Sequence, residues 1–284
     1  WPKINQLLQG GLGNGDFGLI FGNPGGGKSW SLVAIGGHAV RLGYNVLHYT
    51  LELGEEYVGK RYDAFFTKIP VNKVDSHRDK IEELIPQLPG QLIIKEYPTG
   101  RASVSTIESH IAKSTSMGVK PDLVIIDYVD LLSSRKTNRE RKDEIDDIYT
   151  STKGLARQLN IPIWSVSQVN RAGAQDKVIQ GDKAAGSYDK IMITDFCMSL
   201  SRKKEDKVNN TGRFHLMKNR YGMDGITFGL EADTSTGHFT VKDEYIEGEE
   251  SENFEPSSKS NKFDTDVDTF DKQLLRKKFF ELNP

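Results

Sequence analysis

The chain has 284 residues, of which 36% are hydrophobic and 27% are charged, and its formal net charge is -2. No apolar run reaches the roughly 18 residues that a membrane-spanning helix needs. The single cysteine, Cys197, excludes an internal disulfide, and the first residues lack the basic start and apolar middle of a secretory signal. We expect a cytoplasmic protein with no membrane partner, and the start at Trp1 is compatible with a fragment of a longer chain.

The charge is unevenly distributed along the sequence. Residues 243–284 contain twelve acidic and six basic side chains, a net charge of -6, which leaves +4 on residues 1–242. We expect residues 1–242 to form one folded domain and residues 243–284 to form an acidic tail of disordered composition. Near the end of that tail, four apolar residues at helical spacing could form a short helix: Phe263, Val267, Phe270 and Leu274.

Strands and helices alternate up to residue 168. The run FGLIFG at 17–22 predicts a short buried strand, and the apolar spacing of 29–43 predicts a helix after it. Ser103 or Ser105 could cap a later helix. The alternation predicts an α/β fold with a mostly parallel, twisted sheet and helices on both faces. The further expected strands are 45–52, 91–97, 121–128 and 161–168, and the further expected helices are 55–66, 103–116 and 138–160.

The pattern changes after Gln168. Residues 169–187 are polar and glycine-containing, and they exceed the usual length of a connection in a compact domain, so we expect a functional loop there. Four short apolar runs follow, at 195–201, 212–219, 225–231 and 237–241. We expect these runs to form an antiparallel C-terminal extension of the sheet.

A glycine-rich segment lies between the first expected strand and the first expected helix. Its sequence, GNPGGGKS, matches the pattern G-x-x-x-x-G-K-[ST] in full and in the strand–loop–helix context that the pattern requires. Glycines allow successive backbone amides to turn inward around phosphate oxygens, and the helix adds the positive end of its dipole. A nucleotide-binding loop is therefore expected, and a chance glycine-rich turn is the alternative. The nucleotide-binding candidates are Gly22, Asn23, Pro24, Gly25, Gly26, Gly27, Lys28 and Ser29.

The loop supplies two groups with defined chemistry. Lys28 would neutralise the β- and γ-phosphates of ATP, and the Ser29 hydroxyl would bind Mg2+. Asp127 ends the apolar strand LVIID, so its carboxylate would lie beside the loop and bind the metal ion through water. A strand-end aspartate commonly caps a turn instead, and it is the pairing with Lys28 and Ser29 that favours the metal site.

Hydrolysis also needs a group that orients and deprotonates water. Glu52, at the end of the second expected strand, is the candidate base, whereas Glu55 and Glu56 more simply cap the next helix. Gln168 ends another strand, where its amide could bind the γ-phosphate or the attacking water and report the nucleotide state to the following loop. An ordinary polar strand end is the alternative for Gln168.

Five segments resemble the RecA-like motor domain of DnaB-family replicative DNA helicases, most closely the T4-like bacteriophage type. They are WPKINQLLQGGLGNGDFGLIFGNPGGGKS, NVLHYTLELGEEYVGKR, IIKEYPTG, LVIIDY and KNRYG. The resemblance implies a RecA-like P-loop NTPase fold and a homo-hexameric ring that hydrolyses ATP with Mg2+, moves along single-stranded DNA and unwinds duplex. It implies that Glu52 is the catalytic base and Gln168 the sensor. Primase or other replisome proteins are the further partners it suggests.

The resemblance also implies roles for basic residues. It makes Lys218 and Arg220 groups that reach the nucleotide of the neighbouring subunit, although two basic residues on one strand face would otherwise be ordinary surface. It places DNA contacts in the loop after Gln168, and the candidates there are Arg171, Lys177 and Lys183. Ordinary surface charge is the alternative for each of them. That loop departs from the family pattern, since it reads KAAG where Arg-Glu-Ser-Gly is common.

Two other classes of function fit parts of the sequence. One is a RecA-fold recombinase or clock-type ATPase, and the other is a nucleotide-gated interaction protein with little turnover. Glu52, Gln168 and Arg220 argue against the second class. The six histidines lack metal-ligand spacing, and Cys197 is expected in the core. We therefore predict a magnesium-dependent ATP hydrolase acting as a replicative helicase motor.

Overall fold

The computed structural model describes residues 1–134, 140–169, 178–180 and 188–245. Trp1–Ile246 form one compact unit. The second unit, Glu247–Pro284, lies outside the described residues, and so does the helix predicted in the tail. Within the described residues, no helix has the length and apolar character that crossing a bilayer requires.

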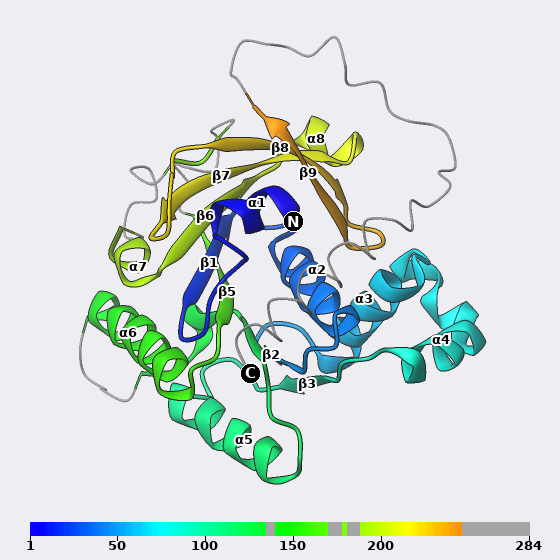
Figure 1. The fold of residues 1–284 in the computed structure, drawn as a ribbon, viewed down its shortest axis with the longest axis horizontal. Coiled ribbons are helices and arrows are strands. Elements are labelled where there is room, and N and C mark those ends of the chain that lie inside the picture. The colour runs from blue at the N-terminus through cyan, green and yellow to red at the C-terminus, as the bar shows by residue number, and fades with distance from the viewer. Residues whose placement is uncertain (135–139, 170–177, 181–187, 246–284) are drawn as a thin grey trace, which may run out of the picture. The chain divides into compact units, whose positions relative to one another are not determined.

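A sheet of nine strands runs through the unit in the order β3-β2-β4-β5-β1-β6-β7-β8-β9 (Figure 1). The first six strands in this order pair in parallel, and β7, β8 and β9 are added antiparallel. The α/β fold class predicted from the sequence is confirmed. The strands are β1 Phe17–Gly22, β2 Val46–Thr50, β3 Leu92–Glu96, β4 Leu123–Asp127, β5 Ile163–Gln168, β6 Phe196–Ser201, β7 Thr211–Asn219, β8 Thr227–Asp233 and β9 His238–Glu244.

One strand of the predicted antiparallel extension runs the other way. The strand expected at 195–201 is β6, which pairs in parallel with β1 in the register Leu19↔Cys197. The extension therefore begins one strand later, at β7. The sequence could not reveal this because a short apolar run has the same composition in either direction, and its direction depends on a partner far away in the chain.

Helices cover both faces of the parallel strands. α2 and α3 lie on one side and α5 and α6 on the other (Figure 1). These four helices match the predicted ones, whereas α1, α4, α7 and α8 were not predicted. The helices are α1 Pro2–Leu7, α2 Lys28–Arg41, α3 Glu55–Thr67, α4 Arg78–Leu84, α5 Val104–Ser116, α6 Arg141–Leu159, α7 Tyr188–Ile193 and α8 Lys204–Val208, with 3-10 turns at Val71–His77, Ile85–Gln87 and Val129–Leu131.

The alternation of side chains along β1 separates two apolar cores. Phe17, Leu19 and Phe21 point into the core under α5 and α6, whereas Ile20 points into the core under α2 and α3. All six residues of β1 are buried, as expected for a central parallel strand with helices on both faces. The loop that follows β1 therefore begins at the end of a fully buried central strand.

Helix ends follow the local rules with one correction. Ser103 caps α5: its hydroxyl accepts from the backbone N–H of Thr106, which is one of the two capping positions predicted. Glu55 and Glu56 do not cap α3. Its N-cap is Gly54. The two glutamates lie in the first turn, where their negative charges interact favourably with the positive end of the helix dipole.

Candidate nucleotide-binding site

The site lies at the carboxyl-terminal edge of the parallel strands. Gly22 at the end of β1 is paired in register with Gln168 at the end of β5, and Thr50 at the end of β2 is paired with Asp127 at the end of β4. Parallel strands bring the loops after their carboxyl ends to one edge, where open α/β sheets bind ligands. The register therefore gathers residues that are far apart in the sequence.

The glycine-rich loop needs its glycines for two physical reasons. Gly25 has a φ of 66° and Gly27 has a φ of 99°, values that residues with a Cβ atom rarely adopt. At Gly22 the restriction is space, since a Cβ there would lie 2.9 Å from the carbonyl oxygen of Leu200. Gly27 is the N-cap of α2, so the loop passes directly into the amino-terminal turn of a 14-residue helix. This arrangement suits an anion.

Lys28 folds back over the loop. Its ammonium donates to the backbone carbonyl of Asn23 at 3.0 Å, and the residue is only 8% exposed. Burial lowers the pKa of Lys28, while the negative charges of Asp127 and Glu52 act in the opposite direction. A buried ammonium attracts a phosphate group more strongly than an exposed one because little water screens its charge, although the nearby carboxylates offset part of that attraction.

Asp127 is the buried carboxylate of the site. It is 1% exposed, and burial raises its pKa to about 6, although the Ser29 hydroxyl, which donates a hydrogen bond to it, and the cations Arg61 and Lys28 limit the rise. Its Oδ1 atom is buried with no hydrogen-bond partner among the described residues. An unsatisfied carboxylate oxygen is costly to bury, and each such atom in a folded protein calls for an explanation.

A magnesium ion fits these two groups. Hydroxyl and carboxylate oxygens are the hard ligands that Mg2+ prefers, and the ion usually keeps several waters and takes the rest of its ligands from phosphate. Among the described residues, no cluster of three or more His, Cys, Asp or Glu side chains could hold a metal ion alone. The unpartnered Oδ1 of Asp127 beside Ser29 therefore matches a metal ion that arrives with a nucleotide.

Glu52 and Gln168 flank the loop from neighbouring strands. The Thr50 hydroxyl donates to the carbonyl of Leu53 at 2.7 Å and accepts from its N–H at 3.2 Å, which closes the turn that presents the exposed Glu52. Gln168 is also exposed, and its amide nitrogen lies 3.4 Å from the hydroxyl of Tyr128. Both side chains can thus face a ligand in the loop.

One cavity of about 310 Å³ joins these groups. It is lined by Gly25, Gly27, Lys28, Ser29, Glu52, Asp127 and Gln168, among others. The structure therefore brings the sequence-predicted candidates for metal coordination and water activation together with most of the loop, although Gly22, Asn23 and Gly26 do not line the cavity.

Arg61 is a lining residue that the sequence analysis missed. It extends from α3 into the cavity, its guanidinium lies 5.1 Å from the ring centre of Trp30, and burial lowers its pKa against the opposing charges of Asp127 and Glu52. A signal for it existed, because Arg61 lies three residues after the buried Val58 and so falls on the inward stripe of an amphipathic helix.

The extension of the sheet closes over the loop from the other side. Thr234, in the turn between β8 and β9, lines the cavity, and a Cβ at Gly27 would lie 3.4 Å from its methyl group and 3.5 Å from Nη1 of Arg202. The Nη2 atom of Arg202 is buried without a hydrogen-bond partner in the described part of the chain. Neither residue has a local sequence signal, since both approach the loop only through strand pairing.

Lys218 and Arg220 lie away from this cavity. They are at the end of β7, which runs antiparallel to β6, so they fall at the amino-terminal edge of the parallel strands. Six residues of β1, roughly 20 Å at 3.3 Å per residue, separate that edge from the loop. Lys218 donates to the backbone carbonyls of Ile191 at 2.9 Å and Met192 at 2.7 Å. Burial, followed by the positive charge of Arg220, lowers the pKa of Lys218.

The predicted DNA-binding residues Arg171, Lys177 and Lys183 lie outside the described residues, as does the KAAG segment.

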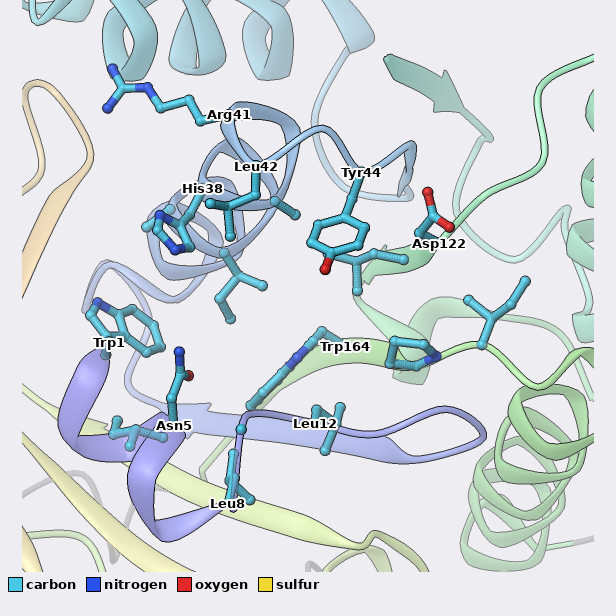
Figure 2. Close-up of a pocket in the computed structure, with 18 of the residues that line it drawn as sticks. Trp1, Asn5, Leu8, Leu12, His38, Arg41, Leu42, Tyr44, Asp122 and Trp164 are labelled. Carbon is cyan, nitrogen blue, oxygen red and sulfur yellow. The ribbon is translucent and has the colours of Figure 1, made fainter. Parts of the chain in front are cut away.

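A larger cavity of about 820 Å³ lies between α1, α2 and the residues that precede β4 and β5 (Figure 2). Trp1, Leu8, His38 and Trp164 are among the side chains that surround it (Figure 2). None of the sequence-predicted site residues lines this second cavity.

The sequence matches the family model of the DnaB-like helicase C-terminal domain over residues 2–240. The chain belongs to this family. The DnaB-like replicative helicase of Enterobacteria phage T4 is 24% identical over 235 residues, which cover 77% of this chain and 49% of the relative. The replicative DNA helicase DnaB of Mycoplasma genitalium is 26% identical over 257 residues, which cover 82% of this chain and 54% of the relative. This DnaB-like chain thus spans about half the length of these curated relatives.

Two solved structures share the DnaB-like fold. One, described as an ATPase domain, superposes with a TM-score of 0.73 and 23% identity, covering 84% of this chain and 88% of that one. The other, a DnaB-like replicative helicase studied for its interactions with primase, superposes with a TM-score of 0.73 and 22% identity, covering 84% and 60%. These likenesses confirm the predicted fold.

Proposed function

We propose that the protein is the ATP-driven motor of a replicative DNA helicase, which moves along single-stranded DNA and unwinds duplex. The observation that carries the proposal is the grouping of Lys28, Ser29, Glu52, Asp127 and Gln168 around one cavity in a chain of the DnaB-like helicase family. Curated relatives are named as replicative helicases, which supports the same interpretation.

In the proposed reaction, the triphosphate lies along residues 22–29. The inward-turned amides and the ammonium of Lys28 neutralise its oxygens. Glu52 accepts a proton from the attacking water as the water oxygen bonds to the γ-phosphorus, and the bond to the β–γ bridging oxygen breaks to give ADP and phosphate. Gln168 orients that water or binds the γ-phosphate, so the end of β5 registers whether the γ-phosphate is present.

Ser29 and Asp127 would hold Mg2+ together with the nucleotide. The burial of Asp127 and its unpartnered Oδ1 support this assignment. When bound, the metal ion supplies the positive charge that neutralises developing charge on the phosphate oxygens. Arg61 extends from α3 into the cavity that Glu52 and Asp127 also line, and we propose that its positive charge helps to align Glu52 toward the attacking water.

Arg220 supports a site shared between copies of the chain. It lies at the sheet edge opposite its own cavity, so it could meet only a nucleotide bound by a neighbour. A guanidinium supplied in this way stabilises charge on the transferring phosphoryl group. We therefore propose a homo-hexameric ring on single-stranded DNA in the cytoplasm of a bacterial or phage-infected cell. Primase is a further proposed partner, and it is named with one structural relative.

The decisive experiment is strand displacement on a forked DNA with ATP and Mg2+. The Lys28→Ala variant should lose ATP hydrolysis and unwinding by about a hundredfold or more, because a buried charge that faces the phosphates is gone. The matched control is Lys242→Ala. Lys242 is a half-exposed lysine of β9, and its ammonium pairs with the carboxylate of Glu231 on β8 at 2.9 Å. That control should retain both activities.

Each other outcome points to a different class. ATP hydrolysis with no strand displacement would contradict the helicase function and favour a recombinase or clock-type ATPase. Nucleotide binding with no hydrolysis, even on DNA, would favour the nucleotide-gated interaction protein. Equal activity of the Lys28→Ala variant and the wild type would exclude the loop as the site of hydrolysis.

A further inference from the structure

Asp195 is a fully buried aspartate that directly precedes β6. Its side chain is 0% exposed, and both of its oxygens are bound. Oδ2 accepts from the backbone N–H of Phe17 at 2.8 Å and from the ammonium of Lys153, and Oδ1 accepts from Nη1 of Arg220 at 2.7 Å. The backbone of Asp195 also bonds to Phe17 and Arg220, each at 3.0 Å. The carboxylate is therefore fixed to β1, α6 and the end of β7.

Arg220 shares this carboxylate with Lys153 and is the more exposed of the two cations. The ammonium of Lys153 is 12% exposed and pairs with Oδ2 while also donating to the carbonyl of Gly15 at 2.9 Å. Lys153 also lies 3.9 Å from Oδ1 of the buried Asp16, so the two carboxylates of this cluster are balanced by two cations, Lys153 and Arg220. The side chain of Arg220 is 48% exposed. A guanidinium has five N–H donors in a planar fork, and Asp195 holds one end of that fork.

We propose that Asp195 is a positioning residue for Arg220. Its buried Oδ1 holds the guanidinium in the orientation in which it meets the nucleotide bound by a neighbouring subunit. This inference rests on the proposed action of Arg220 on a neighbour. An exposed arginine has many rotamers and loses that freedom when it binds. Anchoring to an immobile carboxylate removes the freedom beforehand, and a preorganised charge stabilises a transition state without reorganising during the reaction.

A neighbouring bond offers a matched comparison. The hydroxyl of Tyr221 donates to Oδ1 of Asp16 at 2.5 Å, one residue after Arg220 and at the same edge of the sheet. The variant Tyr221→Phe loses a hydroxyl–carboxylate bond there but leaves the contact between Arg220 and Asp195 in place. A general disturbance of the edge should therefore affect Tyr221→Phe as well, whereas loss of positioning should not.

The test measures DNA-stimulated ATP hydrolysis by the full-length protein assembled on single-stranded DNA. The variants are Asp195→Asn, Arg220→Ala, their combination and Tyr221→Phe. Asparagine keeps the size of the side chain and an acceptor for the N–H of Phe17, but it removes the charge that holds the guanidinium. We expect Asp195→Asn to lower kcat about tenfold or more while KM for ATP changes less than about twofold, because only a transition-state interaction is lost.

The combined variant should be no slower than Arg220→Ala, because the two residues act as one unit. Tyr221→Phe should keep the wild-type kcat. If Asp195→Asn does not assemble, Asp195→Glu takes its place. It keeps the charge beside Lys153 and displaces the carboxylate by one methylene group, and it should show the same loss of kcat at constant KM.

Four results would overturn the positioning role. If Asp195→Asn kept the wild-type kcat while Arg220→Ala was impaired, the positioning role of Asp195 would be excluded, and the proposed action of Arg220 on its neighbour would stand. Losses that add in the combined variant, or an equal loss in Tyr221→Phe, would reduce Asp195 to a structural contact. Wild-type kcat for Arg220→Ala would overturn both the positioning role and the proposed function of Arg220.

Discussion

Asp127 shows how a single residue of the site is placed at a cost to stability. Its carboxylate is 1% exposed, and burial raises its pKa from 3.8 to about 6. A raised pKa means that the folded state penalises the ionised form. The penalty is full above pH 6, decreases as the pH falls through 6, and is absent below the ordinary pKa. A carboxylate that binds a metal ion must be ionised, so in the proposed role of Asp127 a cation would offset the cost that burial imposes on its charged form.

We expect the variant Asp127→Asn to be more stable than the wild type without nucleotide, by up to ~3 kcal/mol at pH 8, since a shift of about two pKa units is worth roughly that much. The gain should decrease as the pH approaches 4. Urea denaturation at pH 8, 6 and 4 measures it. ATP hydrolysis by this variant should be lost, because the amide cannot replace the carboxylate beside Mg2+.

The control for this prediction is Asp122→Asn, which makes the same chemical change at an exposed aspartate whose Oδ2 accepts from the N–H of Asn45 at 2.8 Å. It should bring no gain in stability at any of the three pH values. A stability of Asp127→Asn that equals or falls below the wild type at pH 8 would show that burial does not penalise the carboxylate.

At the scale of elements, the position of α2 depends on its contact with α3. A Cβ at Gly36 would lie 2.3 Å from the hydroxyl of Tyr62, and one at Gly37 would lie 2.4 Å from the ring of Phe65. The two helices can therefore lie this close only because α2 carries two glycines there. α2 begins with Lys28 and α3 carries Arg61, so this contact helps to position two of the residues that line the cavity.

We expect Gly37→Ala to lower the free energy of unfolding by about 1–3 kcal/mol, because the added methyl group overpacks the contact between α2 and α3. The matched control is Gly154→Ala in α6, where a Cβ meets nothing within 4 Å. That variant should gain about 0.4–1 kcal/mol from the reduced entropy of the unfolded chain. Urea denaturation measures both changes, and a stabilising Gly37→Ala would contradict the close contact.

At the scale of the whole molecule, the nucleotide cavity and Arg220 lie at opposite edges of one sheet. In the proposed function, a single chain would therefore hold two half-sites that cannot meet within it. If copies assemble in a ring, each cavity is completed by the next copy, and hydrolysis becomes a property of the interface between copies. This division links the chemistry to movement, because closing an interface is itself a displacement of one subunit against another.

Mixing two inactive variants tests this division. Lys28→Ala has a defective cavity and an intact Arg220, and Arg220→Ala has the reverse. In a mixed assembly, an intact cavity can face an intact arginine, so we expect the equimolar mixture to recover about a quarter of the wild-type ATPase rate if subunits mix at random. The mass of the particle with a nonhydrolysable ATP analogue and single-stranded DNA, measured with one variant uniformly 15N-labelled, shows whether mixed assemblies form. Mixed hexamers without recovered activity would contradict a shared site.

The sequence by itself determined the parts of the site that depend on local rules. The loop at 22–29 could be identified because glycine spacing, the Lys-Ser pair and the strand–helix context lie within a few residues of one another. The alternation of strands and helices determined the parallel sheet, and parallel strands placed Glu52, Asp127 and Gln168 at one edge. The capping of α5 by Ser103 was predictable for the same reason, since the cap lies within one turn.

Only the tertiary structure decided what depends on pairing between distant segments. The parallel direction of β6 follows from its contact with β1, almost two hundred residues earlier, and that contact then fixes Arg202 beside the loop and Asp195 at the opposite edge. Arg61 enters the cavity because α3 packs against α2. In each case the sequence supplies a side chain of suitable chemistry, but its place is set by long-range packing, which leaves no local pattern to read.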